Sequence, residues 1–340
     1  MAGVCLDQSE TEMARRELFG TLPDGSPVDI IHLRGAGGVE MSVMTYGCVI
    51  ISLLAPDRKG RSGNIVLGFD RLDRYVRESP YFGAVVGRYA NRIADARFVL
   101  DGRVCRLGPN EPPNHLHGGF SGFDKQTWDA EIAAAGSGVV FRRTSPDGEE
   151  GYPGTLDVQV TYTITNRNVL QVAYEAVTDA PTHVNLTQHS YFNLRGAEDG
   201  LVANVLGHCL SINADLYLPV TDRLIPTGAL APVANTPFDF HDPVALGSRN
   251  GGNYDHTFVL NRAGADLTLA ARVFEPVTGR TLDVRTTEPG LQVYAGGDHR
   301  GLCLETQHYP DSPNHPDFPS TVLRPGQRYV SRTEFAFGIG

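Results

Sequence analysis

This chain of 340 residues has almost no lysine, since Lys59 and Lys125 are its only two. It also lacks any dense run of basic residues, and its net charge is -10 at pH 7. Nucleic acids and anionic membrane surfaces select proteins with concentrated positive charge. We therefore expect neither of them as a partner.

Long apolar runs are absent as well. No segment reaches the roughly 20 consecutive apolar residues that cross a bilayer, and the N-terminal stretch MAGVCLDQSETEMARRELFG is not a secretory signal. The five cysteines are scattered, with no Cys-x-x-Cys. This spacing is typical of free thiols in a reducing compartment and not of a disulfide framework or a zinc site. We expect a soluble, cytoplasmic protein.

The motifs of several large enzyme classes are also missing. The sequence has no G-x-S-x-G and no P-loop, and the GAGG at 35–38 is too short and wrongly placed for a dinucleotide fingerprint. Nothing in the sequence calls for a redox cofactor. We expect a protein that uses no cofactor and no metal.

Strand patterns fill the chain from end to end. Apolar side chains recur at every second position from Val158 to Ile164, which is typical of a half-buried strand. The segment ARFVLDGRVCRL predicts two short strands joined at Asp101-Gly102. Helical patterns are weak and predict at most a few turns, at 11–20 and 70–79.

These patterns predict an all-β fold, a large single-domain antiparallel β-sandwich with two curved sheets packed face to face. Length alone would suggest about two domains, but all-β domains are often large, and no change in composition marks a linker. Strands that cross a broad concave sheet can turn several polar side chains toward one cleft.

The segment NLTQHSYFNL, residues 185–194, is an unusual strand. Read with a period of two, one face carries Asn185, Thr187, His189, Tyr191 and Asn193. A strand that serves only the core would place aliphatic residues on one face and charged residues on the other. We interpret this polar row as the lining of a binding cleft, with Asn185 and Thr187 in supporting roles.

Glu305 is the most informative candidate for chemistry. It stands inside the apolar stretch GLCLETQ, where a carboxylate is either an edge residue facing water or a buried functional group. Burial would raise its pKa and make it a better base near neutral pH.

Histidines suggest a second kind of site. His115 and His117 would lie on one strand face and resemble one arm of a metal site. Together with His189 and Glu305 they could form the centre of a metal-dependent, cupin-like enzyme. A single His-x-His is a weak indication, because most such pairs bind nothing.

Two further stretches combine polar groups with glycine and aromatic residues. GRYANRI, at 87–93, contains Arg88, Asn91 and Arg92, and GGNYDHTF, at 251–258, contains Asp255. Taken singly, Arg92 could form a structural ion pair and Asp255 could be a turn residue. Their occurrence together with the histidines and Glu305 favours a functional site.

Taken together, the motifs resemble the sequence signatures of the aldose 1-epimerases, also called galactose mutarotases. The resemblance runs from about residue 18 to 338, so we divide the chain into an N-terminal extension, 1–17, and an aldose 1-epimerase β-sandwich domain, 18–340. The matching stretches are, in order, SPYFGAVVGRYANRI, NHLHGG, NLTQHSYFNL, YDHTFVL and GLCLETQHYPDSPNHPDFPSTVLRPG.

The resemblance implies a fold, an activity and a set of site residues. The fold would be a β-sandwich with a concave sugar cleft, and the activity would be exchange between the α and β anomers of free aldoses such as glucose or galactose. His189 would be the general acid and Glu305 the general base. The positions that match sugar-binding residues are Asn91, Arg92, His117, Tyr191, Asp255 and Gln292.

Some features lie outside this match. The loop after Tyr294, AGGDHRG, is shorter than the usual stretch of the family, and His115 receives no role. The expected partner is a monosaccharide, with no nucleic acid and no membrane, and the chain would act as a monomer or a homodimer.

Acid and base groups are sufficient for anomer exchange, because only the C1–O5 ring bond breaks and reforms and no electron moves. Glu305 would take the proton of the C1 hydroxyl, and His189 would give a proton to the ring oxygen. Two alternatives stay open, the first within the same fold and the second of a different class. One is a sugar-phosphate 1-epimerase, with Arg88 and Arg300 as candidate cations, and the other is a carbohydrate-binding protein without catalysis.

Overall fold

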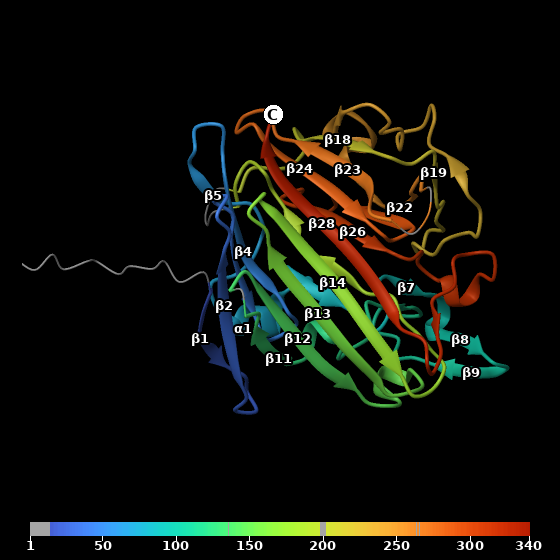
Figure 1. The fold of residues 1–340 in the computed structure, drawn as a ribbon. Coiled ribbons are helices and arrows are strands. Elements are labelled where there is room, and N and C mark those ends of the chain that lie inside the picture. The colour runs from blue at the N-terminus through green and yellow to red at the C-terminus, as the bar shows by residue number, and fades with distance from the viewer. Residues whose placement is uncertain (1–13, 135, 198–201, 263, 265) are drawn as a thin grey trace, which may run out of the picture.

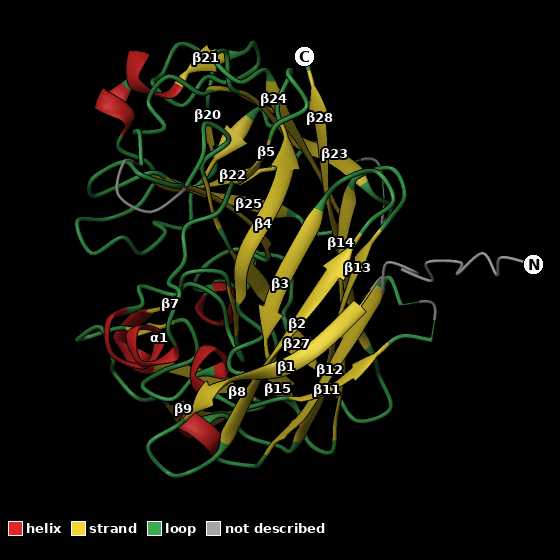
Figure 2. Cartoon of the chain, turned by 90° about the vertical axis from the view of Figure 1, so that its left-hand side faces the viewer, coloured by secondary structure: helices red, strands yellow, loops and turns green. Residues whose placement is uncertain are grey.

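The computed structural model describes residues 14–134, 136–197, 202–262, 264 and 266–340. Antiparallel sheets dominate the chain, as the sequence predicts (Figures 1 and 2). Within the described ranges α-helix is confined to α1 (Leu72–Glu78), and no helix is long and apolar enough to cross a membrane. Short 3-10 turns occur at Ala94–Ala96, Phe123–Lys125, Glu149–Gly151, Leu246–Ser248, Asn250–Gly252 and Ser312–Asn314.

The largest sheet has nine strands, and its long members cross the molecule side by side (Figure 1). Alternate residues are buried along the central strands, and in β13 they include Val158, Val160, Tyr162 and Ile164, as predicted. In spatial order the strands are β11 (Asp129–Ile132), β12 (Gly138–Ser145), β13 (Leu156–Ile164), β14 (Val169–Thr178), β28 (Tyr329–Ile339), β24 (Arg280–Thr286), β23 (Thr268–Phe274), β18 (Cys209–Ile212) and β21 (Val244–Ala245).

A six-stranded sheet packs against the inner face of this sheet. One continuous apolar core contains Val160 and Phe335 from the larger sheet and Leu291 and Leu304 from the smaller one, so the two sheets form a sandwich. Burial of each such side chain stabilises the fold by roughly 1.5–3 kcal/mol. In order, the six strands are β17 (Tyr191–Phe192), β26 (Leu302–Gln307), β25 (Gly290–Tyr294), β22 (Asp255–Val259), β19 (Leu216–Tyr217) and β20 (Ala231–Pro232).

The remaining strands form a five-stranded sheet and four short pairs. The five-stranded sheet consists of β1 (Ala14–Thr21), β2 (Pro27–Arg34), β3 (Glu40–Met44), β4 (Ile50–Pro56) and β5 (Ser62–Asn64). The pairs are β6 (Ala84–Val86) with β16 (Thr187–His189), β7 (Arg92–Ile93) with β10 (His115–Leu116), β8 (Arg97–Leu100) with β9 (Arg103–Arg106), and β15 (Thr182–His183) with β27 (Val322–Leu323).

Of the short elements predicted in the first third of the chain, the hairpin and one helical turn are present and the other helical turn is not. The hairpin at Asp101-Gly102 and the helical turn within 70–79 are confirmed by β8–β9 and α1. The helical turn predicted at 11–20 is wrong, because residues 14–21 form β1. This segment has no apolar stripe to bury as a helix, whereas antiparallel pairing with β2, interrupted only between Leu18 and Gly20, gives its backbone hydrogen-bond partners. Residues 14–17 of the predicted extension therefore belong to a strand, and 1–13 lie outside the described residues.

The polar segment 185–194 is two short strands and not one. β16 pairs with β6 and β17 pairs with β26, and the chain changes partner at Ser190. The side chain of Gln188 fills the gap in the ladder, since its Oε1 accepts the Ser190 N–H at 2.8 Å and its amide donates to the Gly83 carbonyl at 2.9 Å. Directly after His189, the segment therefore leaves its pairing with β6 and joins the six-stranded sheet beside β26.

Candidate active site

A cleft with a volume of about 190 Å³ is lined by His189 at the end of β16, Tyr191 at the start of β17 and Glu305 within β26, and it brings together distant parts of the chain. It contains seven of the eight predicted site residues, and Gln292 is the exception. Its lining consists of Pro80, Tyr81, Asn91, Arg92, Leu116, His117, His189, Tyr191, Asp255, Tyr294 and Glu305.

Glu305 reaches the cleft from the middle of the six-stranded sheet. Its strand β26 is paired on both sides, with β17 through Cys303 and with β25 through Glu305 itself, which lies opposite Gln292. The next residue, Thr306, points the other way and contacts Thr333 of the larger sheet through the two hydroxyl groups. Only 2% of Glu305 is exposed. The exposed-edge interpretation of this residue is therefore wrong, and the buried one is confirmed.

Glu305 and His189 form a buried acid–base pair, with 3.6 Å between His189 Nε2 and Glu305 Oε2. Burial raises the pKa of Glu305 well above its usual value, and the negative charge of Asp255 adds to this effect. Burial also lowers the pKa of His189 to about 4. A net charge on the pair is thus unfavourable in either direction, so the two residues together favour holding one proton.

His117 and Asn91 meet because β7 and β10 are antiparallel neighbours, with Arg92 opposite Leu116. Gly118 gives the chain room to turn there, since at its φ of +86° a Cβ would lie 1.8 Å from the Gly87 carbonyl oxygen. The Asn91 N–H donates to His117 Nδ1 at 3.1 Å. The neutral His117 ring therefore carries its hydrogen on Nε2, and burial keeps its pKa well below the usual value. His117 is a hydrogen-bond donor to the cleft.

A charged network forms the other wall of the cleft. Arg92 Nη1 lies 3.5 Å from Asp255 Oδ2, and its Nε and Nη2 bind Glu111 at 2.7 and 2.8 Å. Gln292 donates from Nε2 to Asp255 Oδ1 at 2.5 Å and accepts a hydrogen bond from Thr257. Gln292 thus holds Asp255 and does not line the cleft, so its contact with a ligand stays a prediction.

The metal centre of four residues considered from the sequence is wrong, because His115 does not lie with His117, His189 and Glu305. The His115 ring is held elsewhere, with Nδ1 at 2.7 Å from the Gly108 carbonyl and Nε2 at 2.8 Å from the Tyr152 hydroxyl. His117, His189 and Glu305 do place possible ligand atoms within 4.8 Å of one another. They fit a cation poorly, because a metal needs a free lone pair on His117 Nε2 and an ionised Glu305, whereas that nitrogen carries hydrogen and burial favours the protonated carboxyl.

Arg88 and Arg300, the candidate phosphate cations, do not line the cleft. Arg88 is buried, and its guanidinium donates to five oxygens at 2.7 to 3.2 Å. Those oxygens belong to the Ser145 hydroxyl and to the carbonyls of Ser145, Pro146, Pro153 and Gly154. Arg300 is exposed and pairs with Asp298.

We expect Arg88→Lys to destabilise the fold. A lysine has three donors where arginine has five, so at least two buried oxygens would lose their partners, at a cost of about 2–4 kcal/mol. Urea unfolding of the two proteins measures this difference. Arg142→Lys is the matched control, because Arg142 is half exposed on the outer sheet face and its loss should cost under about 0.5 kcal/mol. Equal unfolding midpoints for Arg88→Lys and wild type would contradict the structural role of Arg88.

Sequence reasoning missed several members of the site. Tyr81 and Tyr294 line the cleft, and Glu111 binds Arg92 with both carboxylate oxygens. Tyr81 lies within the matched stretch SPYFG, so a search that weighed aromatic as well as ionisable groups could have found it. No sequence signal links Glu111 to Arg92, because their pairing depends on how the loop before β10 folds back.

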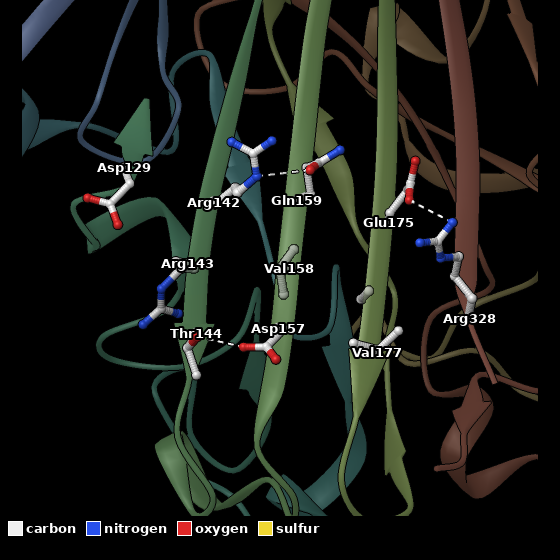
Figure 3. A pocket seen from close by; sticks show the side chains of 11 residues that line it. Asp129, Arg142, Arg143, Thr144, Asp157, Val158, Gln159, Glu175, Val177 and Arg328 are labelled. Atoms are coloured by element: carbon white, nitrogen blue, oxygen red, sulfur yellow. Dashed lines mark hydrogen bonds and ion pairs between the residues drawn. The ribbon is translucent and has the colours of Figure 1, made fainter. Parts of the chain in front are cut away.

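A second depression, of about 340 Å³, lies on the outer face of the nine-stranded sheet. Figure 3 shows three contacts among its side chains, Arg142 with Gln159, Thr144 with Asp157 and Arg328 with Glu175. Among the described residues no histidine lines this depression, so it lacks a buried imidazole–carboxyl pair such as the one in the cleft.

Comparison with known proteins gives one consistent result. The family model for aldose 1-epimerases matches residues 29–336. The galactose mutarotase of Mus musculus is 44% identical over 344 residues, covering 95% of this chain and 98% of the relative, and the aldose 1-epimerase of Escherichia coli (strain K12) is 38% identical over 339 residues, covering 93% and 96%. A solved aldose epimerase homologue from C. elegans superposes with a TM-score of 0.85 at 29% identity, covering 91% of this chain and 98% of that one.

Proposed function

Because this chain belongs to the aldose 1-epimerase family, we propose that it interconverts the α and β anomers of a free aldose by opening and closing the sugar ring. The observation that carries the proposal is the buried pair of His189 and Glu305 on the floor of the cleft. The cleft suits a ligand of the size of one monosaccharide. Assembly as a monomer or homodimer and a cytoplasmic location stay predictions from the sequence.

The pair can perform both proton transfers without a change in its total charge. In the reactive arrangement Glu305 is ionised and His189 is protonated. Glu305 takes the proton of the C1 hydroxyl while His189 gives one to the ring oxygen, and the C1–O5 bond breaks. The pair then consists of a protonated carboxyl and a neutral imidazole, so it still holds one proton. After rotation about C1–C2 the same transfers run backwards and close the ring on the other face.

The other polar groups of the cleft would orient the sugar. Asp255 and Arg92 offer charge-assisted hydrogen bonds to hydroxyl groups, Asn91 offers its amide, and His117 offers the N–H of Nε2. The hydroxyl of Tyr191 already donates to the Pro80 carbonyl at 2.9 Å, so this residue would meet the sugar with its ring.

Polarimetry tests the proposal directly. Freshly dissolved α-glucose, α-galactose and α-xylose should each be followed with and without the protein, and with glucose 6-phosphate as a fourth sugar. We expect the free aldoses to reach anomeric equilibrium faster than in water alone. Binding without acceleration would favour a carbohydrate-binding protein, and acceleration of the phosphorylated sugar alone would favour a sugar-phosphate 1-epimerase.

We expect Asp255→Asn to raise KM more than it lowers kcat. Asp255 would hold hydroxyls away from C1, and such contacts bind substrate and transition state alike. Loss of one charged hydrogen bond, about 1.5–3 kcal/mol, corresponds to a KM increase of roughly 10–100-fold. Steady-state kinetics with galactose separates the two constants. A collapse of kcat at unchanged KM would instead place Asp255 in the chemistry.

We expect full activity without any metal. His189 and Glu305 supply both proton transfers, and the Nδ1 bond of His117 leaves its Nε2 without a lone pair for a cation. Protein treated with a chelator and dialysed should keep its rate, and added zinc or manganese should not raise it. Stoichiometric metal by elemental analysis, together with activity lost on chelation and restored by that metal, would overturn this prediction.

A further inference from the structure

No hydrogen bond to another described residue holds either nitrogen of the His189 imidazole. Its Nε2 faces Glu305, but its Nδ1 is buried and finds no hydrogen-bond partner among the described residues. Histidines that do chemistry usually have the second nitrogen held by a carboxylate or a carbonyl, which fixes the orientation of the ring. In this site the orientation of the ring has to come from packing.

Two tyrosine rings lie nearly parallel to this imidazole. The ring of Tyr191 is 5.1 Å away at an interplanar angle of 21°, and the ring of Tyr81 is 5.8 Å away at 23°. The ring of Tyr81 also contacts His117, at 4.6 Å. Parallel rings restrict rotation of the imidazole about its Cβ–Cγ bond, and one such ring contact contributes roughly 0.5–1.5 kcal/mol.

The loop that carries Tyr81 is fastened to the strand that carries His189. The Gly83 N–H donates to the His189 carbonyl at 3.0 Å, and Tyr191 donates its hydroxyl hydrogen to the Pro80 carbonyl at 2.9 Å. Tyr81 and His189 are therefore held in register by hydrogen bonds on either side of Tyr81.

Tyr81 is also held in an unfavourable backbone conformation. Its φ of +67° lies in the left-handed region, which costs a residue other than glycine roughly 1–3 kcal/mol. The ammonium of Lys125 lies 5.2 Å from the centre of the Tyr81 ring and is fixed by an ion pair with Asp124 at 2.7 Å. The surroundings thus oppose relaxation of the loop and keep the ring at its place beside the two histidines.

From this geometry we propose that Tyr81 is a positioning residue, which with Tyr191 holds the imidazole of His189 in line with Glu305 and with the ring oxygen of the sugar. Ring stacking takes the place of the missing hydrogen bond at Nδ1. The inference rests on the proposed function. It would explain why Tyr81 keeps an unfavourable backbone conformation in this loop.

Two substitutions of Tyr81 separate this role from simple filling of space. Tyr81→Phe keeps the flat ring and should retain kcat within about 3-fold, whereas Tyr81→Leu removes the ring face and should lower kcat by about 10–100-fold, as expected for a misplaced catalytic group. KM should change less than kcat in the leucine variant. Tyr81→Met fills similar space without a ring and provides the same comparison if Tyr81→Leu does not fold.

Phe69→Leu is the matched control. Its ring packs on Tyr75 and Phe82 in the neighbouring apolar cluster and lies outside the cleft, so its loss should change stability but not kcat. The proposal is overturned if folded Tyr81→Leu and Tyr81→Met match Tyr81→Phe in kcat, or if KM alone rises. Absence of mutarotation by the wild-type protein would instead reject the proposed function.

Discussion

Glu305→Gln is expected to lower the rate of anomer exchange by roughly 10²–10⁴-fold, the contribution of one positioned acid–base group. The amide has the shape of the carboxyl but cannot take the proton of the C1 hydroxyl. Polarimetry, corrected for the spontaneous rate in water, measures the loss. Because the burial of Glu305 opposes its charge, the neutral side chain should leave the fold at least as stable as before.

Binding of the sugar should survive this substitution, since the amide still fills the site. Calorimetric titration of Glu305→Gln with galactose tests this point. Glu111→Gln is the matched control, because Glu111 is the partly exposed carboxylate that pairs with Arg92 and does not line the cleft. We expect it to affect KM and not the chemical step. If Glu305→Gln still exchanges anomers within a factor of a few of wild type, Glu305 is not the base.

The sandwich could be predicted from the sequence because alternation is a local property. The burial pattern of β13 and the turn at Asp101-Gly102 follow from neighbouring residues. β1 was missed because its backbone is stabilised by pairing with β2, which no local pattern reveals. The break at Ser190 depends on a side-chain bond from Gln188, which is likewise a tertiary detail.

The polar row of 185–194 was only partly a cleft lining. His189 and Tyr191 do face the cleft, but Asn185 binds the backbone of Ala90 and His308, and Thr187 donates to the Thr306 carbonyl. These bonds fasten neighbouring elements beneath the site. The supporting roles predicted for Asn185 and Thr187 are thus confirmed, because both side chains form hydrogen bonds to the protein backbone.

Two members of the site that sequence reasoning missed, Tyr81 and Glu111, lie in loops. Tyr81 has a left-handed backbone conformation within its loop, and Glu111 binds Arg92 from the loop before β10. Neither position follows from periodicity, because a loop is placed by the elements it connects. Gln292 lies on β25 opposite Glu305, and the structure adds that its amide holds Asp255, while its predicted contact with the sugar stays a prediction.

His189→Asn should lower the rate by a similar factor, roughly 10²–10⁴-fold, since asparagine cannot protonate the ring oxygen. The pH profile of wild-type kcat/KM gives an independent check. Burial lowers the pKa of His189 to about 4 and raises that of Glu305. Activity should therefore fall at acid pH as the pair takes up a second proton, near pH 4, and at alkaline pH as it loses its only proton.

The double variant, Glu305→Gln with His189→Asn, decides whether the two residues act as one unit. If a single proton is exchanged between sugar and pair in each direction, loss of either partner already removes the concerted path. The double variant should then be only a little slower than the slower single variant, far from the product of the two losses. A loss equal to that product would mean that acid and base act in separate, independent steps. The proposal that His189 and Glu305 transfer both protons together, with the total charge of the pair unchanged, would then be wrong.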